Sequence, residues 1–278
     1  MKQAAIIGAG TMGSGIAQAF AASGKWRVIL CDINETLAEN GRGRIQKGLD
    51  KLVNKGKIDQ EVANGVLTRI AVGSLEAAQG SRLVVEAALE RMDVKRDIFK
   101  ALARVCGEET IFASNTSSLS LTEMAADLGR SVVGMHFFNP APVMKLVEVT
   151  AGLDTPPETV AQVMSIAEEL GKTPVQVQEG PGFVVNRILI PMINEAALIL
   201  SEGIASAEDI DVAMKLGANH PMGPLALGDL IGLDVCLAIM EVLQAETGDS
   251  KYRPAPILRK LVRGGRLGRK SGAGFFAY

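Results

Sequence analysis

The sequence is poor in the residues that build metal centres and disulfide frameworks. It has two histidines and three cysteines among 278 residues, and Cys31, Cys106 and Cys236 lie far apart, with no close-spaced metal-binding pattern. We therefore expect no metal site, and cysteines scattered in this way are typical of small buried residues in a reducing compartment. The formal net charge of -2 gives no overall basic surface, so nucleic acid is not expected as a partner.

The chain also lacks an unbroken apolar run long enough to cross a membrane. The most apolar window, 183–200, is interrupted by Asn186, Arg187, Asn194 and Glu195, which is typical of a buried helix. The amino terminus leads from a short apolar run into a glycine loop and has no signal-peptide pattern. These features predict a cytoplasmic protein with no membrane partner.

A glycine-rich turn follows the first apolar run. Residues 4–7 have strand composition, Gly8, Gly10 and Gly13 come next, and a helical pattern covers 11–22. In a dinucleotide-binding turn, the first glycine permits the tight turn, the second lets the backbone approach a pyrophosphate, and the third lets helix and strand pack closely. The amides at the helix start would then face the phosphates.

A carboxylate stands where such a site needs one. The second strand, 28–31, leads into Asp32, 19 residues after Gly13, at the position that holds the adenosine ribose hydroxyls. An acid there repels a 2'-phosphate, and no arginine follows before Arg42, so NAD is favoured over NADP. The alternative is a structural glycine turn with a helix-capping aspartate.

Strand-like and helix-like segments alternate up to about residue 180. This alternation predicts an α/β fold, a Rossmann-like doubly wound and mainly parallel sheet, in an NAD-binding domain of residues 1–180. Only helical patterns follow, several of them apolar over more than one face, so residues 181–278 are expected to form an all-helical substrate and dimerisation domain of a homodimer. The expected strands are 4–7, 28–31, 70–72, 83–86, 111–113, 132–135, 146–150 and 174–177, and the expected helices are 11–22, 35–67, 75–78, 92–105, 158–170, 183–201, 206–215, 223–247 and 257–262.

The two strands around the turn 139–142 carry a histidine and a carboxylate. The chain is expected to run up to His136, reverse through Asn-Pro-Ala-Pro and return through Glu148. A carboxylate inside Leu-Val-Glu-Val is costly to bury unless it is paired, and a histidine across the turn is a suitable partner. The alternative is a satisfied core histidine and a glutamate that faces solvent from an edge strand.

Hydroxyl and amide side chains gather near the same strand ends. Asn115, Thr116, Ser117 and Ser118 follow the strand 111–113, and Asn139 follows His136. In open α/β sheets the ligand binds outside the carboxyl ends of the strands. These residues therefore favour a ligand site over a purely structural role for His136 and Glu148.

Lysines recur along the polar helical segment 35–67. Lys47, Lys51 and Lys55 are spaced four apart, so they share one face of a continuous helix. Such a stripe is usually a solvated face. The alternative is a local anion site for a phosphate-bearing substrate.

Five motifs in sequence order resemble those of the 3-hydroxyacyl-CoA dehydrogenases over essentially the whole chain, and most closely the short bacterial 3-hydroxybutyryl-CoA dehydrogenases. They are the glycine loop, Asn-Thr-Ser-Ser, His-Phe-Phe-Asn-Pro, Pro-Gly-Phe-Val-Val-Asn-Arg and Gly-Arg-Lys-Ser-Gly. The resemblance implies NAD-dependent hydride transfer at C3 between 3-hydroxybutyryl-CoA and acetoacetyl-CoA, in butyrate-type fatty acid metabolism. No catalytic position departs from the family, although Ala273 stands where close relatives often carry lysine.

The resemblance also assigns roles by position. His136 matches the catalytic histidine and Glu148 the acid that orients it, while Ser117 and Asn186 match the residues that hold the C3 oxygen of the substrate. The matched cofactor positions are Gly8, Gly10, Thr11, Met12, Gly13, Asp32, Glu90, Lys95 and Asn115. The matched substrate positions are Ser117, Asn139, Asn186, Lys51 and Lys55, of which the two lysines meet the nucleotide phosphates of coenzyme A.

Two kinds of alternative stay open. The same framework suits a longer or dicarboxylic 3-hydroxyacyl-CoA, or a carbohydrate-derived 3-hydroxy acid. A structural or NAD-sensing protein with an inactive site is the alternative outside enzymes. The joint presence of Ser117, His136, Glu148 and Asn186 argues against it, since a non-catalytic protein needs no such set.

Overall fold

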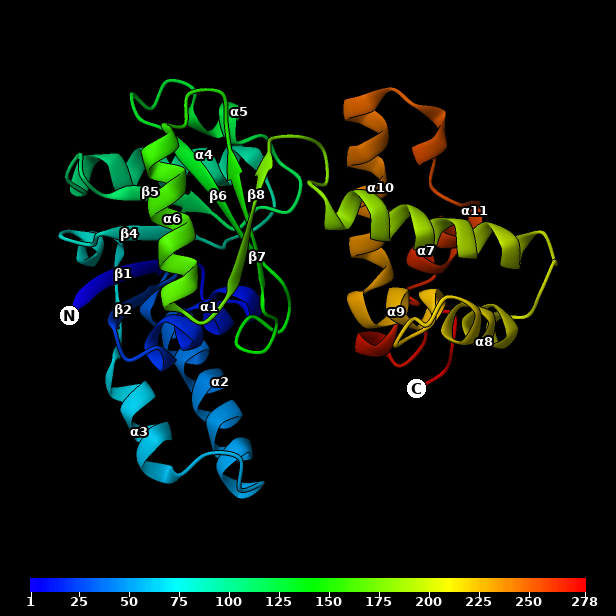
Figure 1. The fold of residues 1–278 in the computed structure, drawn as a ribbon, viewed down its shortest axis with the longest axis horizontal. Coiled ribbons are helices and arrows are strands. Elements are labelled where there is room, and N and C mark those ends of the chain that lie inside the picture. The colour runs from blue at the N-terminus through cyan, green and yellow to red at the C-terminus, as the bar shows by residue number, and fades with distance from the viewer. The chain divides into compact units, whose positions relative to one another are not determined.

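The computed structural model describes residues 1–278 as two compact units, Met1–Glu179 and Gly180–Tyr278 (Figure 1). Each unit has its own hydrophobic core.

The first unit is built on one eight-stranded sheet in the order β3-β2-β1-β4-β5-β6-β7-β8. All neighbouring strands are parallel except β6 and β7, which are antiparallel. The doubly wound, mainly parallel sheet expected from the alternating pattern is therefore confirmed. The strands are β1 (Lys2–Ile7), β2 (Trp26–Cys31), β3 (Ile70–Gly73), β4 (Leu83–Glu86), β5 (Ile111–Ser114), β6 (Val132–Phe137), β7 (Leu146–Ala151) and β8 (Thr173–Gln178).

Helices cover both faces of this sheet because its central strands are apolar on both sides. Along β1, Ala4 and Ile6 belong to one buried cluster, and Ala5 and Ile7 to another, as the two-residue period of a strand requires. The first cluster includes side chains of α1, α2, α3 and α6, and the second includes side chains of η1, α4 and α5. The helices are α1 (Thr11–Ala22), α2 (Glu35–Asn54), α3 (Gln60–Thr68), η1 (Leu75–Ala78), α4 (Met92–Val105), α5 (Leu121–Ala125) and α6 (Pro157–Glu169).

The strand order reverses at β1, which has β2 on one side and β4 on the other. A doubly wound sheet binds its ligand at this reversal, outside the carboxyl ends of the strands. The turns after β1, β4 and β5 begin at that edge, and so does the turn after β6, which is parallel to β5.

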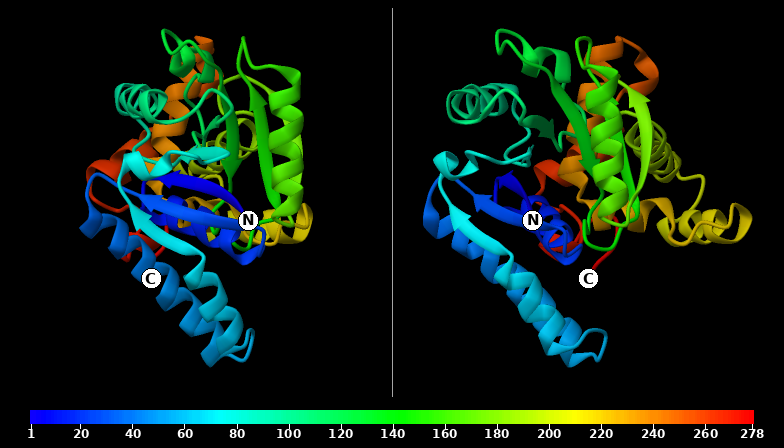
Figure 2. Two further views of the ribbon diagram at one scale, coloured as in Figure 1. Left: turned by 90° about the vertical axis from the view of Figure 1, so that its left-hand side faces the viewer. Right: turned by 60° about the vertical axis from the view of Figure 1, so that its left-hand side comes forward.

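One expectation for the helices of this unit is wrong, and one short helix was not expected. The helical segment 35–67 is not continuous: α2 ends at Asn54, Gly56 adopts a left-handed conformation with φ of 64°, and α3 begins at Gln60. Glycine carries no steric penalty there, so the chain reverses, and α2 and α3 lie side by side and project away from the sheet (Figures 1 and 2). The short helix α5 was not expected, and its first turn is held by the side chain of Glu179, which accepts hydrogen bonds from Ser120 and Thr122.

The second unit is helical, as expected. Its core includes side chains of all five α-helices, among them Ile193, Leu233 and Met240. The expected helix 223–247 is interrupted at Gly232, whose φ of 108° is incompatible with helix. None of the helices combines the length and apolarity that a membrane span requires. The helices are α7 (Val185–Ser201), α8 (Ala207–Gly217), α9 (Pro224–Ile231), α10 (Leu233–Thr247) and α11 (Pro256–Arg263), with the short 3-10 turns η2 (Ser250–Tyr252) and η3 (Arg269–Ser271).

Candidate active site

The glycine loop between β1 and α1 needs its glycines for space and conformation. Gly8 has φ of 99°, and a Cβ on it would lie 2.7 Å from the carbonyl group of Ala87. A Cβ on Gly13 would lie 1.7 Å from the carbonyl oxygen of Gly8, so only glycine lets α1 start this close to β1. Above Gly10 there is open space, with no atom within 4 Å of an added Cβ. The loop therefore leaves room for a ligand directly over its backbone.

The start of α1 offers positive charge to such a ligand. Gly10 is the N-cap, no side chain caps the helix, and its first turn contains no acid. The amides of Thr11 and Met12 lie in this first turn, and an uncapped helix start favours anions such as a pyrophosphate. These features fit the phosphates of a dinucleotide.

Asp32 closes the other side of the loop. Its carboxylate accepts the N–H of Ala9 at 2.6 Å and the N–H of Ile33 at 2.7 Å. Each carboxylate oxygen keeps further lone pairs that can accept from ribose hydroxyls. Arg44 donates to the carbonyl oxygen of Ala9, and Arg42 lies 3.9 Å from Glu39. Both arginines that follow Asp32 thus have a partner within the protein.

The β6–β7 hairpin brings His136 and Glu148 together. They are directly paired residues of the antiparallel ladder, and His136 Nδ1 lies 2.8 Å from Glu148 Oε2. Both are buried, His136 to 6% exposure and Glu148 to 1%. An ionised carboxylate can only accept, so the imidazole donates through Nδ1, and Nε2 is the nitrogen that Glu148 does not engage.

Asn115 joins β5 to the end of β6. Its side-chain oxygen accepts the N–H of Phe137 at 2.8 Å, one residue beyond His136. Phe138 packs on the imidazole, with its ring centroid 4.5 Å from that of His136. Asn115 was predicted as a cofactor contact, and the structure also gives it a part in fixing the backbone beside His136.

Glu90 holds the loop that contains Ser117. Its Oε1 accepts from the backbone N–H of Ser117 at 2.8 Å, from the Ser117 hydroxyl at 3.2 Å and from the Thr116 hydroxyl at 2.7 Å. Its Oε2 lies 3.1 Å from Lys95 Nζ. Burial raises the pKa of the Glu90 carboxyl, but Lys95 and these hydrogen bonds outweigh burial and keep the pKa below its usual value. Glu90 is therefore an ionised acceptor.

Lys95 is almost fully buried, at 1% exposure, between two carboxylates. Its Nζ donates to both oxygens of Glu86 at 2.8 Å, in addition to its contact with Glu90. Glu86, which is fully buried at the end of β4, also accepts from Ser114 and from the N–H of Ala88. Lys95 was predicted as a cofactor contact, and the structure shows its ammonium group inside this network.

Glu86 is the site residue that sequence reasoning missed. The signal was present, because Glu86 ends the apolar run Leu-Val-Val-Glu just as Glu148 interrupts Leu-Val-Glu-Val. A buried carboxylate needs a partner. That partner, Lys95, lies nine residues away across a turn, at a separation that no helix or strand period indicates.

The remaining predicted residues lie on the loop after β6, on and just after α2, and in the second unit. Asn139 is exposed beyond β6, in a loop whose following part is held by Lys172, since Nζ of Lys172 donates to the carbonyl oxygens of Ala141 and Met144 at 2.6 and 2.8 Å. Lys51 and Lys55 are exposed at the end of α2. Asn186 belongs to the second unit, where it is buried in the first turn of α7.

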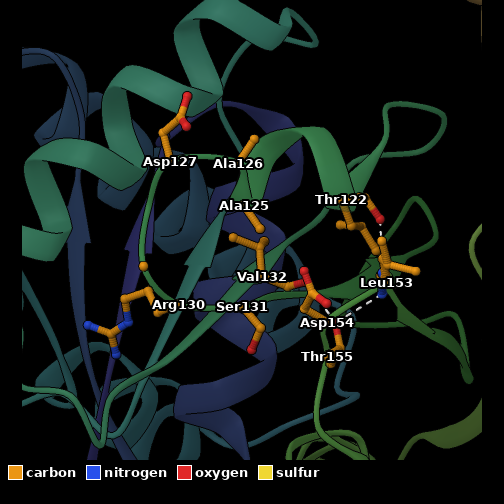
Figure 3. Close-up of a pocket in the computed structure, with 13 residues that line it drawn as sticks. Thr122, Ala125, Ala126, Asp127, Arg130, Ser131, Val132, Leu153, Asp154 and Thr155 are labelled. Carbon is orange, nitrogen blue, oxygen red and sulfur yellow. Dashed lines mark hydrogen bonds between the residues drawn. The ribbon is translucent and has the colours of Figure 1, made fainter.

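A separate hollow of about 470 Å³ lies beside the amino end of β6 (Figure 3). It is lined by residues of α5, of the loop before β6 and of the loop after β7, and it includes none of the predicted site residues. Arg130 lies on its rim, but Nη2 of Arg130 donates to the carbonyl oxygens of Gly107, Glu108 and Thr110. Among the predicted site residues, His136 lies near the carboxyl end of β6, at the opposite end of that strand from this hollow.

Comparison with known proteins agrees with this geometry. Residues 3–180 match the family model of the 3-hydroxyacyl-CoA dehydrogenase NAD-binding domain, and residues 182–278 match that of the C-terminal domain. The chain is 54% identical to a probable 3-hydroxybutyryl-CoA dehydrogenase of Bacillus subtilis, over 100% of this chain and 98% of the relative. It is 43% identical to a 3-hydroxyadipyl-CoA dehydrogenase of Escherichia coli, over 99% of this chain and 59% of the relative.

A solved structure is similar over the whole length. The crystal structure of (S)-3-hydroxybutyryl-CoA dehydrogenase from Ralstonia eutropha superposes with a TM-score of 0.94 at 48% identity, covering 100% of this chain and 99% of that one. The similarity includes both units and the glycine loop that fits a dinucleotide. The chain is thus an enzyme of the 3-hydroxyacyl-CoA dehydrogenase family, the NAD-binding oxidoreductases whose two domain models it matches from end to end.

Proposed function

We propose that the protein interconverts 3-hydroxybutyryl-CoA and acetoacetyl-CoA with NAD, in short-chain (butyrate-type) fatty acid metabolism. The observation that carries this proposal is the buried His136–Glu148 pair, with Nδ1 and Oε2 2.8 Å apart, in a sheet whose first turn is a dinucleotide loop. The relatives from Bacillus subtilis and Ralstonia eutropha, both named for 3-hydroxybutyryl-CoA, support the choice of acyl group.

His136 is the proposed acid and base. NAD(H), when bound, accepts or supplies the hydride at C3. As the keto group is reduced, charge develops on the C3 oxygen, and His136 donates a proton to that oxygen through the ring nitrogen that Glu148 does not engage. In oxidation His136 takes the proton of the 3-hydroxyl. Imidazole suits both directions because it ordinarily titrates near neutral pH, and positioned proton transfer contributes roughly 10²- to 10⁴-fold in rate.

Glu148 and Ser117 have supporting roles in this proposal. Glu148 holds the imidazole through Nδ1, so the ring keeps one orientation and the protonated form is stabilised. Ser117 hydrogen-bonds the C3 oxygen and aligns it, as Asn186 does according to the family resemblance. Asn115 and Asn139 are proposed to line the same site.

The proposed cofactor is NAD in preference to NADP. Asp32 holds the loop through the N–H of Ala9 and keeps lone pairs for the ribose hydroxyls. A 2'-phosphate would meet this carboxylate, and Arg44, which could have received it, donates to the carbonyl oxygen of Ala9 instead. Replacing Asp32 by alanine should therefore weaken the binding of NADH much more than the binding of NADPH.

We further propose a homodimer in the cytoplasm. The second unit exposes large apolar side chains on and near α7 and α8, with Ile188 and Ile204 at 68% and Leu216 at 83% exposure. Several exposed apolar side chains on one unit favour burial against a partner. The cysteines are all free and buried, which fits a reducing compartment. Light scattering after size-exclusion chromatography would measure the mass, and a monomer at micromolar concentration would reject the dimer.

The test of the main proposal is the loss of NADH absorbance when purified protein meets acetoacetyl-CoA. NADPH and free acetoacetate serve as controls for the cofactor and for the CoA group. Rapid loss with NADH and the CoA ester alone is expected. If a folded protein that binds NADH leaves the CoA ester unchanged, the proposed function is wrong.

A dicarboxylic substrate is the second candidate, because the Escherichia coli relative is named for 3-hydroxyadipyl-CoA. A series of 3-hydroxyacyl-CoA esters of increasing length, with and without a terminal carboxylate, separates the two. The proposal requires the highest kcat/KM for the four-carbon ester.

A further inference from the structure

The hydroxyl of Ser117 has one proton, and the structure shows where it points. Ser117 Oγ donates to Oε1 of Glu90 at 3.2 Å, and the same oxygen accepts the N–H of Ser117 at 2.8 Å. An ionised carboxylate has no proton to give, so the hydroxyl must donate and Glu90 must accept. Toward any other group, Ser117 Oγ can then only accept a hydrogen bond.

The hydrogen bond from the Ser117 hydroxyl to Glu90 is not easily broken, because the position of Glu90 is held by charge. Lys95 Nζ lies 3.1 Å from Oε2 of Glu90, and Lys95 is fixed in turn by two contacts of 2.8 Å to the fully buried Glu86. Thr116 adds a hydrogen bond to Glu90 Oε1 at 2.7 Å, and the Thr116 hydroxyl itself accepts the N–H of Leu119 at 2.9 Å. Both carboxylate oxygens of Glu90 are thus held in place, Oε2 by Lys95 and Oε1 by Thr116 and Ser117.

We propose that Glu90, held by the buried Glu86–Lys95 pair, makes Ser117 an acceptor toward the substrate, so that the site binds the 3-hydroxyacyl ester more tightly than the 3-ketoacyl ester. The inference rests on the proposed function, in which Ser117 contacts the C3 oxygen. A 3-hydroxyl group has one proton, which it donates to Ser117 Oγ in the binding complex while a protonated His136 donates to the same C3 oxygen; in oxidation that proton passes to a neutral His136 instead. A keto oxygen has only lone pairs, so it must take the Ser117 proton away from an ionised carboxylate, and charge-assisted hydrogen bonds are the stronger ones.

Glu90 acts through Ser117 and is a positioning residue in this proposal. Glu90→Gln keeps the shape and an amide oxygen for the Ser117 N–H, but this neutral oxygen holds the hydroxyl proton less strongly. The Glu90 side chain is 39% exposed, so the variant is expected to fold. Because the substitution weakens the competitor for the proton, it should favour the keto ester relative to the hydroxy ester.

The measurement is calorimetric binding of 3-hydroxybutyryl-CoA and of acetoacetyl-CoA in saturating ADP-ribose, which cannot take part in hydride transfer. In the native protein the keto ester should have the larger Kd. Glu90→Gln should lower the ratio of the keto Kd to the hydroxy Kd about fivefold. If the role of Glu90 were merely structural, the substitution would weaken the binding of both esters alike and leave the ratio of the two Kd values unchanged.

Two further variants decide the cause. Ser117→Ala should itself lower the ratio, and adding Glu90→Gln to it should change the ratio no further, because no hydroxyl is left to orient. Glu179→Gln is the matched control, since Glu179 also accepts two hydroxyls and an N–H, from Ser120 and Thr122, and the ratio should not change in that variant.

The outcomes separate the two proposals. Turnover of both esters in the native protein, with a ratio that Glu90→Gln leaves within about twofold, would overturn this inference alone. A change of ratio that persists in the Ser117→Ala background would also overturn it. If the native protein neither binds nor turns over the esters, the proposed function fails, and this inference fails with it.

Discussion

Two buried carboxylates lie in strands of the same sheet, and they have different partners. Glu148 in β7 pairs with the imidazole of His136. Glu86 at the end of β4 pairs with the ammonium group of Lys95, which also contacts Glu90. In the proposed mechanism the first pair exchanges a proton with the substrate, whereas the second pair holds its surroundings in place. In this proposal the partner of a buried acid, and not its burial, distinguishes a catalytic role from a structural one.

The largest expected effect is on turnover, at the first pair. His136→Gln removes the only group in the hairpin pair that can exchange a proton with the C3 oxygen, so kcat should fall roughly 10²- to 10⁴-fold. NADH binding should be nearly unchanged, because the glycine loop and Asp32 are untouched. Stopped-flow turnover with acetoacetyl-CoA, together with NADH fluorescence titration, measures both quantities. A variant that retains full turnover would remove His136 from the mechanism.

At the second pair the large effect should be on stability. Lys95→Met leaves Glu86 fully buried without its cation, and breaking one side of a buried ion pair typically costs about 3–5 kcal/mol of unfolding free energy. Lys100→Met is the matched control, because Lys100 lies on the same helix but is exposed. Urea unfolding of both variants makes the comparison. Equal stability of the two variants would contradict a structural role for the Glu86–Lys95 pair.

How far the two pairs were predictable follows from the kind of turn between their residues. His136 and Glu148 flank a proline-rich turn, so a hairpin register pairs them, and their contact was expected before the structure. Glu86 and Lys95 meet only because α4 folds back over the end of β4, and a strand-to-helix turn of this kind has no period that pairs given residues. The roles of all four residues in catalysis and binding stay predictions.

The difference between a local pattern and a turn without a period also explains the errors in the helices. Helical periodicity continues through Gly56 and Gly232, but both glycines adopt positive φ angles, and the chain turns there. The short helix α5 has too few residues to show a period and is held by Glu179, 58 residues beyond Leu121. Local patterns predicted the strands well because most of them are short apolar runs, which the sequence shows directly. Turns that depend on distant side chains leave no local signal.

A smaller effect is expected when the orienting acid of the first pair is neutralised. Glu148→Gln keeps the shape of the side chain and a hydrogen-bonding group at Nδ1, but it no longer stabilises the protonated imidazole, so kcat should fall by roughly 10²-fold. The KM for acetoacetyl-CoA should change little, because Glu148 is buried behind His136. Steady-state kinetics separates the two parameters. A rise in KM with normal kcat would mean that Glu148 supports substrate binding and not the proton transfer.

The smallest expected effect lies outside both pairs, at the end of α2. Lys51 and Lys55 are exposed, so each contact with a CoA phosphate is screened, and replacing both by alanine should raise the KM for acetoacetyl-CoA about fivefold without lowering kcat. An acetoacetyl thioester that lacks the nucleotide should be unaffected. Lys25→Ala with Lys100→Ala removes the same charge from exposed positions elsewhere and serves as the control. If the KM for the truncated thioester rises as much as the KM for the CoA ester, the lysines are only a solvated face. The phosphate contacts must then come from residues outside the α2 stripe.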